Sequence, residues 1–442
     1  MPMSEGSLLC RLRNARARLQ LGQHHYDSKN LPALVENIAA RLLDTGLDPE
    51  LPLAILADDQ TSLIMTLLAA HRLDIAALPL PRNHPQCEEL LGQCGIGQTL
   101  HIHPDGFRLK RSASQHPTSP SPVRLLVATG GSGGHTRVAM LGAGQIMAAA
   151  RLGAQLTNLD DQDGWLIPLP CHHIGGLAAI YRGLLAGSLV HVLQPTNTAE
   201  LTTALRDPRI SHVSLVPTQL ARLVESAHTA PENLRCVLVG GAHVPTTLLQ
   251  RATNLGWPVH TSYGMSESCA MVCMDGMALP ETRIGLNADG RIQLSGPTIM
   301  LGYAEPGLRP GTGLGSDGSF CTSDLGRFNS QGHLQLLGRA DHAFQSGGET
   351  LHPELIEAAL ADCSCLSEAA ITYLADAQWG QVCVLVYRGT CDAAGVDTWC
   401  RRHLPPYWRP KWVFRVDRLP LSAAGKLDRR RLTGMASKLH QS

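Results

Sequence analysis

A glycine-rich segment, TGGSGGHTR at residues 129–137, follows a short apolar stretch and carries the residue types of a phosphate-binding loop. Glycine permits positive φ angles, so successive backbone N–H groups can turn toward one anion, and no Cβ atom blocks the approach of a phosphate. Thr129 and Ser132 add hydroxyl donors, and Arg137 adds a cation. The segment therefore predicts a loop that cradles phosphate groups.

Two familiar phosphate loops do not fit this segment. The Walker A pattern requires Gly-Lys followed by Ser or Thr, which is absent here. The GxGxxG dinucleotide fingerprint fails because Thr136 stands where the third glycine is required. For the motif taken by itself, a mobile surface loop remains the alternative.

Cys171, His172 and His173 are adjacent and have side chains that can bind metals. Three neighbouring residues do not converge easily on one ion, and the chain shows no distal pair of ligands at metal-site spacing. Metal binding at this point is therefore disfavoured, and packing is the preferred interpretation of His172.

Around these residues the chain alternates between helix and strand patterns. Apolar residues recur at helical spacing or in short buried runs, in the order helix, strand, helix, strand, over residues 31–46, 51–57, 61–74 and 75–80. A further helix is expected to begin near Pro85. This alternation predicts an α/β fold with layers of helices around largely buried sheets.

The pattern of predicted helices and strands changes to that of a compact unit after GRADH (338–342), so a domain boundary is expected close to Asp341. We predict a large N-terminal domain of layered sheets and helices at residues 1–340 and a small, mobile α+β domain at residues 341–442. The elements expected in the small domain are a helix near 353–362, strands near 369–375 and 381–387, a helix near 392–403 and a strand near 411–418. Two segments, 112–122 and 304–318, are rich in Ser, Pro or Gly and are expected to be loops.

The bulk composition excludes some classes of partner. Lys+Arg and Asp+Glu both number 37 and the pI is about 7.3, so no global charge steers the chain toward nucleic acid or an anionic membrane. No run approaches the ~18 apolar residues of a membrane span. The thirteen cysteines are odd in number and form no CxxC pair, which favours a cytoplasmic protein with reduced thiols. The oligomeric state is left open.

Five segments, in order, resemble the core motifs of the adenylate-forming superfamily, which includes acyl-CoA synthetases and the adenylation domains of peptide synthetases. They are TGGSGGHTR (129–137), VGGAHVP (239–245), SYGMSE (262–267), TSDLG (322–326) with GRADH (338–342), and LSAAGKLDRRRL (421–432). Residues 31–100 are similar to the N-terminal part of the same fold. The resemblance implies an AMP-forming acid–thiol ligase that uses ATP, Mg²⁺ and coenzyme A.

The resemblance also implies which residues bind the nucleotide. Glu267 would hold Mg²⁺, an ion that favours few carboxylates plus substrate oxygens, and Ser266 would bind a phosphate. Asp324 would accept both ribose hydroxyls, and Arg339 would contact the nucleotide just before the hinge. The other positions implied at the ATP site are Thr129, Gly131, Ser132, Gly133, Gly134 and Arg137 of the loop, Gly240, Gly241 and Ala242 beside the adenine, and Ser262, Tyr263 and Gly264.

Lys426 is similar to the catalytic lysine of the family, whose ammonium bridges the attacking carboxylate and the phosphate oxygens as charge develops. It belongs to the small domain, so it would arrive only when that domain closes. By the same resemblance, the small domain then rotates about Asp341 for thioester formation. Gly347 and Gly348 of SGGE (346–349) would replace Lys426 and shape the tunnel for coenzyme A.

Some positions depart from the family pattern. They are Gly130 and Gly133 where hydroxyl residues are usual, Thr136-Arg137 where Pro-Lys is usual, Ser266 for Thr, and Ser323 for Gly. Arginine keeps the charge of lysine but not its compact geometry. Because Lys426, Asp324 and Glu267 are all present, an active enzyme is expected.

Three further segments resemble the o-succinylbenzoate–CoA ligase family of menaquinone biosynthesis. They are PCHHIGGL (170–177), SLVPTQLARL (214–223) and QSGGETLHPELIE (345–357). By this resemblance His173 lies beside the acyl site, where an imidazole can orient a carboxylate, and is a catalytic candidate. The alternatives are a ligase for another aryl or acyl acid, a stand-alone adenylation enzyme that loads a carrier-protein thiol, and a non-catalytic nucleotide-binding paralogue.

Overall fold

The computed structural model describes residues 8, 16–112, 122–129, 136–194, 197–226, 229–421 and 427–441. The chain forms two compact units. Unit 1 comprises Met1–Gly241, Leu255–Ile284 and Gln293–Cys321, and unit 2 comprises Ala242–Asn254, Gly285–Ile292 and Thr322–Ser442. Both units combine helices with sheets, which confirms the predicted α/β fold class. The boundary between residues 340 and 341 stays a prediction.

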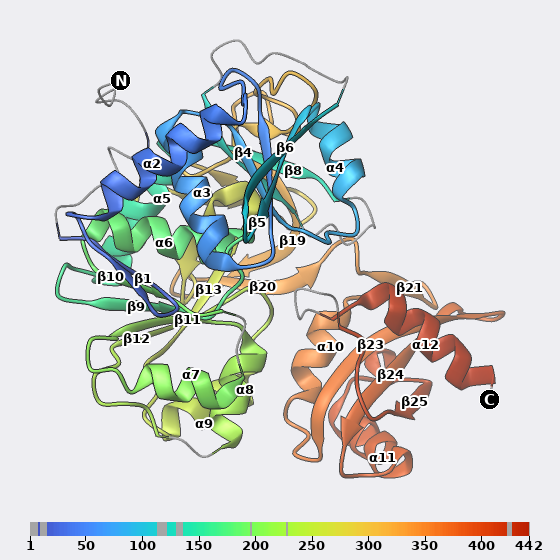
Figure 1. Ribbon diagram of the computed structural model, residues 1–442. Helices are drawn as coiled ribbons and strands as arrows, with labels where there is room; N and C mark the ends of the chain where they lie inside the picture. Colours follow the sequence, from blue (N-terminus) through green and yellow to red (C-terminus); the bar gives the residue numbers. More distant parts are fainter. Residues whose placement is uncertain are drawn as a thin grey trace. The chain divides into compact units, whose positions relative to one another are not determined.

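The larger sheet of unit 1 has nine strands and a parallel centre (Figure 1). Six neighbouring strands run parallel, and the pairs at both edges are antiparallel. Central strands such as GWLI and CVLV are buried at every residue, as expected for strands covered on both faces. The order across the sheet is β15 (Met277–Ala278), β14 (Ala270–Met274), β13 (Val259–Met265), β12 (Cys236–Val239), β11 (His212–Leu215), β9 (Gly164–Ile167), β10 (Leu189–Val192), β1 (Arg18–Leu21) and β2 (His24–Tyr26).

The second sheet of unit 1 has seven strands. Its two central strands are apolar, ALPLP and LAILA, and every residue of LAILA is buried. The order across the sheet is β18 (Gly302–Tyr303), β8 (Val138–Gly142), β7 (Val123–Ala128), β4 (Ala77–Pro81), β3 (Leu53–Ala57), β5 (Gln98–His103) and β6 (Gly106–Arg111). Strands β7, β4, β3 and β5 are parallel, so two runs predicted from the sequence, 51–57 and 75–80, lie side by side at the centre.

Helices of unit 1 separate and cover these sheets. Helix α5 contacts β8 of the seven-stranded sheet and β14 of the nine-stranded sheet, and it packs along α6, which covers β9, β10 and β11. Helix α3 packs on β3, β4 and α2. Figure 1 shows α7 and α8 on the opposite face of the nine-stranded sheet from α5 and α6. The helices are α2 (Leu31–Asp44), α3 (Gln60–Arg72), α4 (Cys87–Cys94), α5 (Ala143–Leu156), α6 (Ile174–Ala186), α7 (Thr198–Leu205) and α8 (Pro217–Glu225).

The helix predicted at 31–46 is confirmed as α2, whose apolar stripe explains it. Val35, Ile38 and Leu42 recur at helical spacing and are buried, and the chain leaves the helix before Gly46, which has a φ of +82°. Helix α3 begins where the Asp59 side chain accepts a hydrogen bond from the Ser62 N–H.

Unit 2 contains a five-stranded sheet with helices α10 (Pro353–Leu360), α11 (Ala393–His403) and α12 (Arg429–Gln441), and it also includes α9 (Thr246–Asn254). The elements predicted for residues 353–418 are confirmed, with the long strands β23 and β24 at the centre. The sheet runs β22 (Glu349–Leu351), β21 (Phe344–Ser346), β24 (Gly380–Gly389) and β23 (Leu366–Asp376), with β25 (Trp412–Arg415) also paired to β24.

The start of α12 is tied to α10 by charge. Arg429 makes two hydrogen bonds to the Glu357 carboxylate, of 3.0 and 2.9 Å, and an ion pair of 3.0 Å to Glu354. The same Glu357 accepts the Ile371 backbone N–H at 2.7 Å, so helix α10, strand β23 and helix α12 share one partly buried network. Arg429, which these bonds fix, follows Lys426 by three residues in the sequence.

A four-stranded sheet carries the two nucleotide-binding candidates of the later motifs. Its order is β16 (Arg283–Leu286), β17 (Arg291–Ser295), β19 (Phe320–Phe328) and β20 (Leu334–Arg339). In the antiparallel pair of β19 and β20, Asp324 lies directly opposite Arg339. The loop predicted at 304–318 is confirmed, since it contains no helix or strand.

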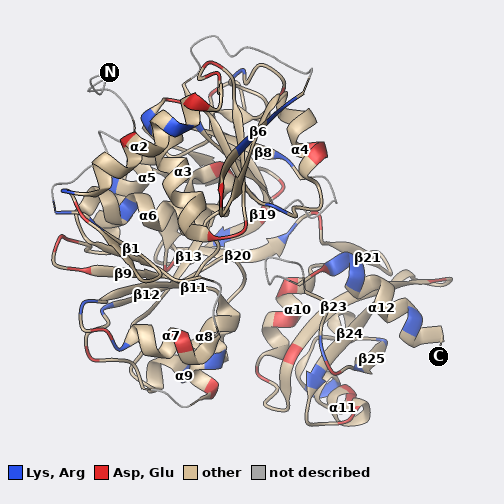
Figure 2. Ribbon diagram, viewed as in Figure 1, with Lys and Arg blue, Asp and Glu red and all other residues tan. Residues whose placement is uncertain are grey.

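Acidic and basic residues are interspersed along the elements of each unit, in keeping with the equal counts of both charges (Figure 2). None of the helices in the described part of the chain has both the length and the apolar character that crossing a bilayer requires.

Candidate active site

Several site candidates of unit 1 gather where parallel strands of the nine-stranded sheet end. His173 follows β9, Gly240 follows β12, and Ser262 lies in β13, which is paired in parallel with β12. Ligands of open α/β sheets bind at the carboxyl ends of such strands, because neighbouring connections leave a crevice there. The fold therefore brings Gly240 beside Ser262, and His173 follows a strand of the same parallel sheet.

The backbone favours glycine at both Gly240 and Gly241. A Cβ atom on Gly240 would lie 3.1 Å from the carbonyl oxygen of Ser262, which is tighter than an ordinary contact. Gly241 has a φ of +82°, a conformation that favours glycine. The close approach leaves the end of β12 without side chains, and Ala242, which follows, is also small. A flat ring could lie against such a surface.

Gly264 shapes the turn that carries Ser266 and Glu267. The pairing of β13 with β14 shifts register between Tyr263 and Gly264, and a Cβ atom on Gly264 would lie 1.8 Å from the carbonyl oxygen of Ala270. The chain then enters a short 3₁₀ helix, η1 (Ser266–Ser268). Only glycine fits at this bulge, and the bulge sets the direction in which the chain continues to Ser266 and Glu267.

The two ends of the predicted phosphate loop meet where β7 ends and β8 begins. Thr129 is buried, and its backbone N–H donates to the carbonyl oxygen of Arg137 at 2.8 Å. The hydroxyl of Thr136 donates to the side-chain oxygen of Gln86 at 2.5 Å. Gly131, Ser132, Gly133 and Gly134 lie outside the described residues, as does Lys426. The base of the loop is thus fixed by bonds on both sides.

Tyr303 joins Arg137 to Glu267, and sequence reasoning missed it. The Arg137 guanidinium carbon lies 4.9 Å from the centre of the Tyr303 ring, and the Tyr303 hydroxyl donates to Glu267 Oε1 at 2.8 Å. Burial, with the nearby Glu267 charge, raises the pKa of Tyr303, so the hydroxyl stays protonated. Tyr303 follows Glu267 by 36 residues and lies in none of the five motifs, so no local pattern pointed to it.

Two glutamines fix the segment before His173, and they too were missed. Gln60 Oε1 accepts the backbone N–H of Cys171 at 2.6 Å, and Gln219 Nε2 donates to the carbonyl oxygen of Pro168 at 3.0 Å. Gln219 is part of the SLVPTQLARL segment, and the resemblance of that segment was the available signal. These bonds hold the connection from β9 to α6 and with it the backbone of His173.

His172 and His173 lie side by side, with ring centres 4.2 Å apart. Burial, with smaller contributions from His173 and His84, lowers the pKa of His172 to about 3, so its imidazole is neutral at physiological pH. The residue before α6 is His173, which occupies the N-cap position with extended backbone. No group of three or more His, Cys, Asp or Glu residues in the described ranges has the arrangement of a metal site.

In unit 2, Arg339 lies between two carboxylates. Its Nη1 is 3.3 Å from Asp324 Oδ1, and its Nε and Nη2 each donate to Asp341 at 2.8 Å. Asp324 is mostly buried, with 16% of its side chain exposed, and its backbone N–H bonds the Thr322 hydroxyl. A carboxylate held in this way is preorganised to accept further donors, such as a pair of hydroxyls.

We expect Asp324→Ala to weaken ATP binding by about 10- to 100-fold, because a charged acceptor of two hydrogen bonds is lost. Calorimetric titration with ATP, in the absence of any acid, measures this affinity. Asp376→Asn is the matched control, since Asp376 is also ion-paired in unit 2, to Lys411 Nζ at 2.6 Å. Unchanged ATP affinity in Asp324→Ala would remove this residue from the ribose site.

Gly347 and Gly348 form the turn between β21 and β22. Both have positive φ, of +60° and +88°, and a Cβ atom on Gly347 would lie 2.4 Å from the Trp379 ring. The Gly347 backbone N–H also donates to the carbonyl oxygen of Trp379 at 3.1 Å. The turn is therefore restricted to glycine and is packed against a half-exposed indole.

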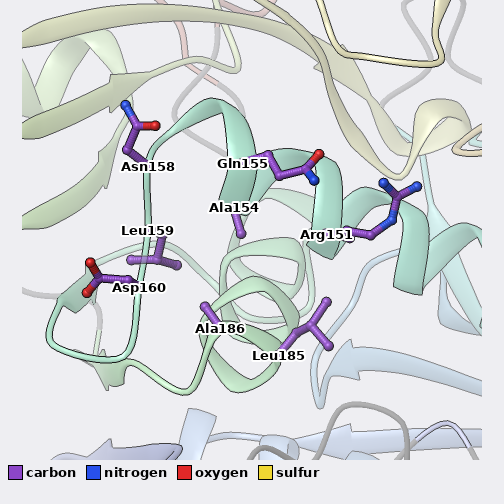
Figure 3. A pocket seen from close by; sticks show the side chains of 8 residues that line it. All are labelled: Arg151, Ala154, Gln155, Asn158, Leu159, Asp160, Leu185 and Ala186. Atoms are coloured by element: carbon purple, nitrogen blue, oxygen red, sulfur yellow. The ribbon is translucent and has the colours of Figure 1, made fainter.

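An open depression of about 600 Å³ lies elsewhere on unit 1 (Figure 3). The end of α5 and the turn after it, between residues 151 and 160, line it together with Leu185 and Ala186 of α6. Its lining includes none of the predicted site residues that the structure describes, and Arg151 there already pairs with Glu281 at 2.9 Å. We therefore locate the candidate site at the strand ends and not in this depression.

Comparison with protein families agrees with this geometry. The family model described as AMP-binding enzyme matches residues 13–304, and the one described as AMP-binding enzyme C-terminal domain matches residues 355–426. A solved structure of o-succinylbenzoate CoA synthetase from Bacillus subtilis, in complex with the acyl-adenylate intermediate, has a TM-score of 0.84 at 25% identity. The match covers 96% of this chain and 97% of that chain.

Curated relatives point in the same direction. The 2-succinylbenzoate–CoA ligase of Bacillus licheniformis is 32% identical over 298 residues, which are 62% of this chain and 62% of that protein. The ligase of the same name from Bacillus velezensis is 30% identical over 330 residues, 70% of this chain and 68% of that protein. The matched region thus spans less than two thirds of the first relative. Both resemblances predicted from the motifs are confirmed.

Proposed function

Because the chain belongs to the AMP-binding enzyme family, we propose that it activates o-succinylbenzoate with ATP and transfers the acyl group to coenzyme A. In the first step, a carboxylate oxygen attacks the α-phosphorus, and an acyl-adenylate forms as pyrophosphate leaves. In the second step, the coenzyme A thiol attacks the acyl carbon, and AMP leaves. The observation that carries the proposal is the arrangement of Arg137, Tyr303 and Glu267 at the base of the predicted phosphate loop.

The residues to which the resemblance assigns nucleotide binding would hold the ATP. Gly240, Gly241 and Ala242 offer a surface without bulky side chains to the adenine, and Asp324 offers a mostly buried carboxylate to the ribose hydroxyls. Backbone amides of the loop between Thr129 and Arg137 would bind the phosphates, since glycine-rich turns present successive N–H groups to one anion.

Glu267 fits the role of a magnesium ligand. One of its oxygens, Oε1, is bonded to Tyr303, and a single protein carboxylate suffices for Mg²⁺, which takes most of its remaining ligands from water and phosphate oxygens. The ion would neutralise charge on the phosphates during the attack. Arg137 would add a second positive charge at the same end of the loop.

The acid would lie near His173, at the carboxyl end of β9. The connection that carries His173 is fixed by Gln60 and Gln219, so its imidazole is presented from a rigid backbone. Neutral His172 beside it adds no competing charge. An imidazole in this position can donate a hydrogen bond that orients a carboxylate.

Lys426 would serve the adenylation step, and the Gly347–Gly348 turn the thioester step. The resemblance supports both roles, and the half-exposed indole packed against Gly347 supports the second, because it keeps that turn rigid. A domain rotation about Asp341 between the two steps is part of the proposal, as is the boundary at residues 340 and 341. We place the enzyme in the cytoplasm, where ATP and coenzyme A are supplied, and in menaquinone biosynthesis.

A panel of carboxylic acids tests the proposed substrate. Each acid is incubated with enzyme, ATP, Mg²⁺ and coenzyme A, and the thioester is identified by mass spectrometry. We expect o-succinylbenzoate to give the highest kcat/KM. A higher value for benzoate, malonate or a fatty acid would contradict the assignment of the acid and keep the ligase chemistry. Acyl-adenylate that reacts with a carrier protein and not with coenzyme A would contradict the assignment of the thiol.

A further inference from the structure

We propose that Tyr303 is a positioning residue that couples the phosphate loop to the magnesium site. Its hydroxyl orients the Glu267 carboxylate for Mg²⁺, and its ring positions the guanidinium of Arg137 at the end of the loop. The inference rests on the proposed function, because it assumes that magnesium and ATP bind at this place.

The Tyr303 ring is fixed from several sides. Its backbone belongs to β18 and pairs with Ala139 of β8, and its N–H donates to the carbonyl oxygen of Thr312 at 2.8 Å. The edge of the ring meets Phe320, with ring centres 6.3 Å apart. Gly313 packs so closely that a Cβ atom there would lie 2.5 Å from the ring. Because the ring is fixed, it can position the side chains of Glu267 and Arg137 that contact it.

Glu267 is fixed at both its backbone and its side chain. The backbone N–H of Met300 donates to the Glu267 carbonyl oxygen at 2.8 Å, and the Tyr303 hydroxyl donates to Oε1 at 2.8 Å. The hydrogen bond leaves the other carboxylate oxygen to a cation and sets the plane in which it lies. Outer partners of this kind are a general means by which proteins raise the metal affinity of a ligand.

Arg137 lies over the same ring. Its guanidinium carbon is 4.9 Å from the ring centre, a distance at which a cation is attracted to the π system. A planar guanidinium stacks on an aromatic ring better than an ammonium does. These contacts account for Thr136-Arg137 at the position where the family usually has Pro-Lys. Arg137 lies over the aromatic ring of Tyr303, and the Thr136 hydroxyl donates to the Gln86 side chain.

The consequence is that the cation of the loop and the carboxylate of the metal site share one rigid support. Loss of the hydroxyl should free Glu267 and keep the contact of Arg137 with the ring, whereas loss of the whole ring should remove both contacts. The two parts can therefore be separated with Tyr303→Phe and Tyr303→Leu.

The test measures ATP binding by calorimetry without any acid, in EDTA and over a series of Mg²⁺ concentrations. We expect Tyr303→Phe to raise the Mg²⁺ concentration for half-maximal binding by about tenfold, the lower end of the usual loss for an outer partner of a metal ligand. Affinity in EDTA should stay within about twofold of the unaltered protein, since the ring and Arg137 remain. Tyr387→Phe is the matched control, because the Tyr387 hydroxyl donates to a backbone carbonyl oxygen, that of Cys391, at 3.0 Å.

The second arm of the test uses Arg137→Lys. As a single substitution, Arg137→Lys should weaken ATP binding in EDTA by about threefold. Added to Tyr303→Leu, it should have no further effect, because the ring that the guanidinium contacts is already absent. An unchanged Mg²⁺ requirement in Tyr303→Phe would overturn the role of the hydroxyl. Equal losses in EDTA and in Mg²⁺, with a lower melting temperature, would reduce Tyr303 to a structural residue and also overturn it.

The identity of the acid does not affect this result, because no acid is present. If the unaltered protein binds no ATP at any Mg²⁺ concentration, the proposed function and this inference fail together. If it binds ATP with a Mg²⁺ requirement that Tyr303→Phe leaves unchanged, only the inference fails.

Discussion

Replacing Lys426 with alanine is expected to slow acyl-adenylate formation by about 10²–10³-fold while thioester formation from preformed acyl-adenylate stays nearly unchanged. An ammonium that bridges the carboxylate and the α-phosphate acts only while charge develops between them, and one such donor is typically worth this factor. The second step joins a thiol to a carbonyl carbon, at which Lys426 has no proposed role. Rapid-quench assays with ATP and acid, and separately with synthetic acyl-adenylate and coenzyme A, measure the two steps.

Lys438→Ala is the matched control, because Lys438 lies in the last turn of α12 in the same unit. It should leave both steps as they are. Equal loss in both half-reactions for Lys426→Ala would mean that this lysine supports folding of the small domain or binding of a shared substrate, and the catalytic assignment would be wrong.

Replacing Gly264 with alanine is expected to cost about 3 kcal/mol of the free energy of unfolding and to abolish magnesium-dependent ATP binding. The new Cβ atom would lie 1.8 Å from the Ala270 carbonyl oxygen, so β13 and β14 would have to separate at the bulge. Ser266 and Glu267 follow within three residues, and their turn would move with the strand. Urea denaturation and calorimetric titration with ATP measure the two effects.

Gly144→Ala tests whether the loss comes from crowding and not from the loss of a glycine as such. Gly144 lies in helix α5 of the same unit, and nothing is within 4 Å of the position of its new Cβ atom. Alanine there should stabilise the protein by up to about 1 kcal/mol, since it favours helix. If Gly264→Ala keeps the stability and the Mg²⁺ dependence of the unaltered protein, the bulge does not position Glu267.

The helices and strands could be predicted where one segment carries its own pattern. LPALVENIAARLLD has an apolar stripe, LAILA is a buried run, and α2 and β3 form at these positions. The strands of the small domain could be predicted for the same reason, because β23 and β24 contain alternating or continuous apolar residues. The parallel order of the sheets cannot be predicted from any one segment, since strand neighbours depend on contacts between distant segments.

The site residues that could not be predicted from the sequence are those whose role depends on contacts between distant segments. Tyr303 matters because it touches Arg137 and Glu267, and Gln60 because it reaches the backbone of Cys171. Neither residue has a distinctive neighbourhood in the sequence. Gly264, in contrast, lies within a recognised motif, but its reason, the close approach of Ala270, appears only when β14 is in place.

The most direct test of the central claim is pyrophosphate release with ATP, Mg²⁺ and coenzyme A, in the presence and in the absence of o-succinylbenzoate. We predict release that depends on the acid, together with formation of its coenzyme A thioester in equal amount. No release with this acid, under conditions in which the protein binds MgATP, would contradict the proposed function.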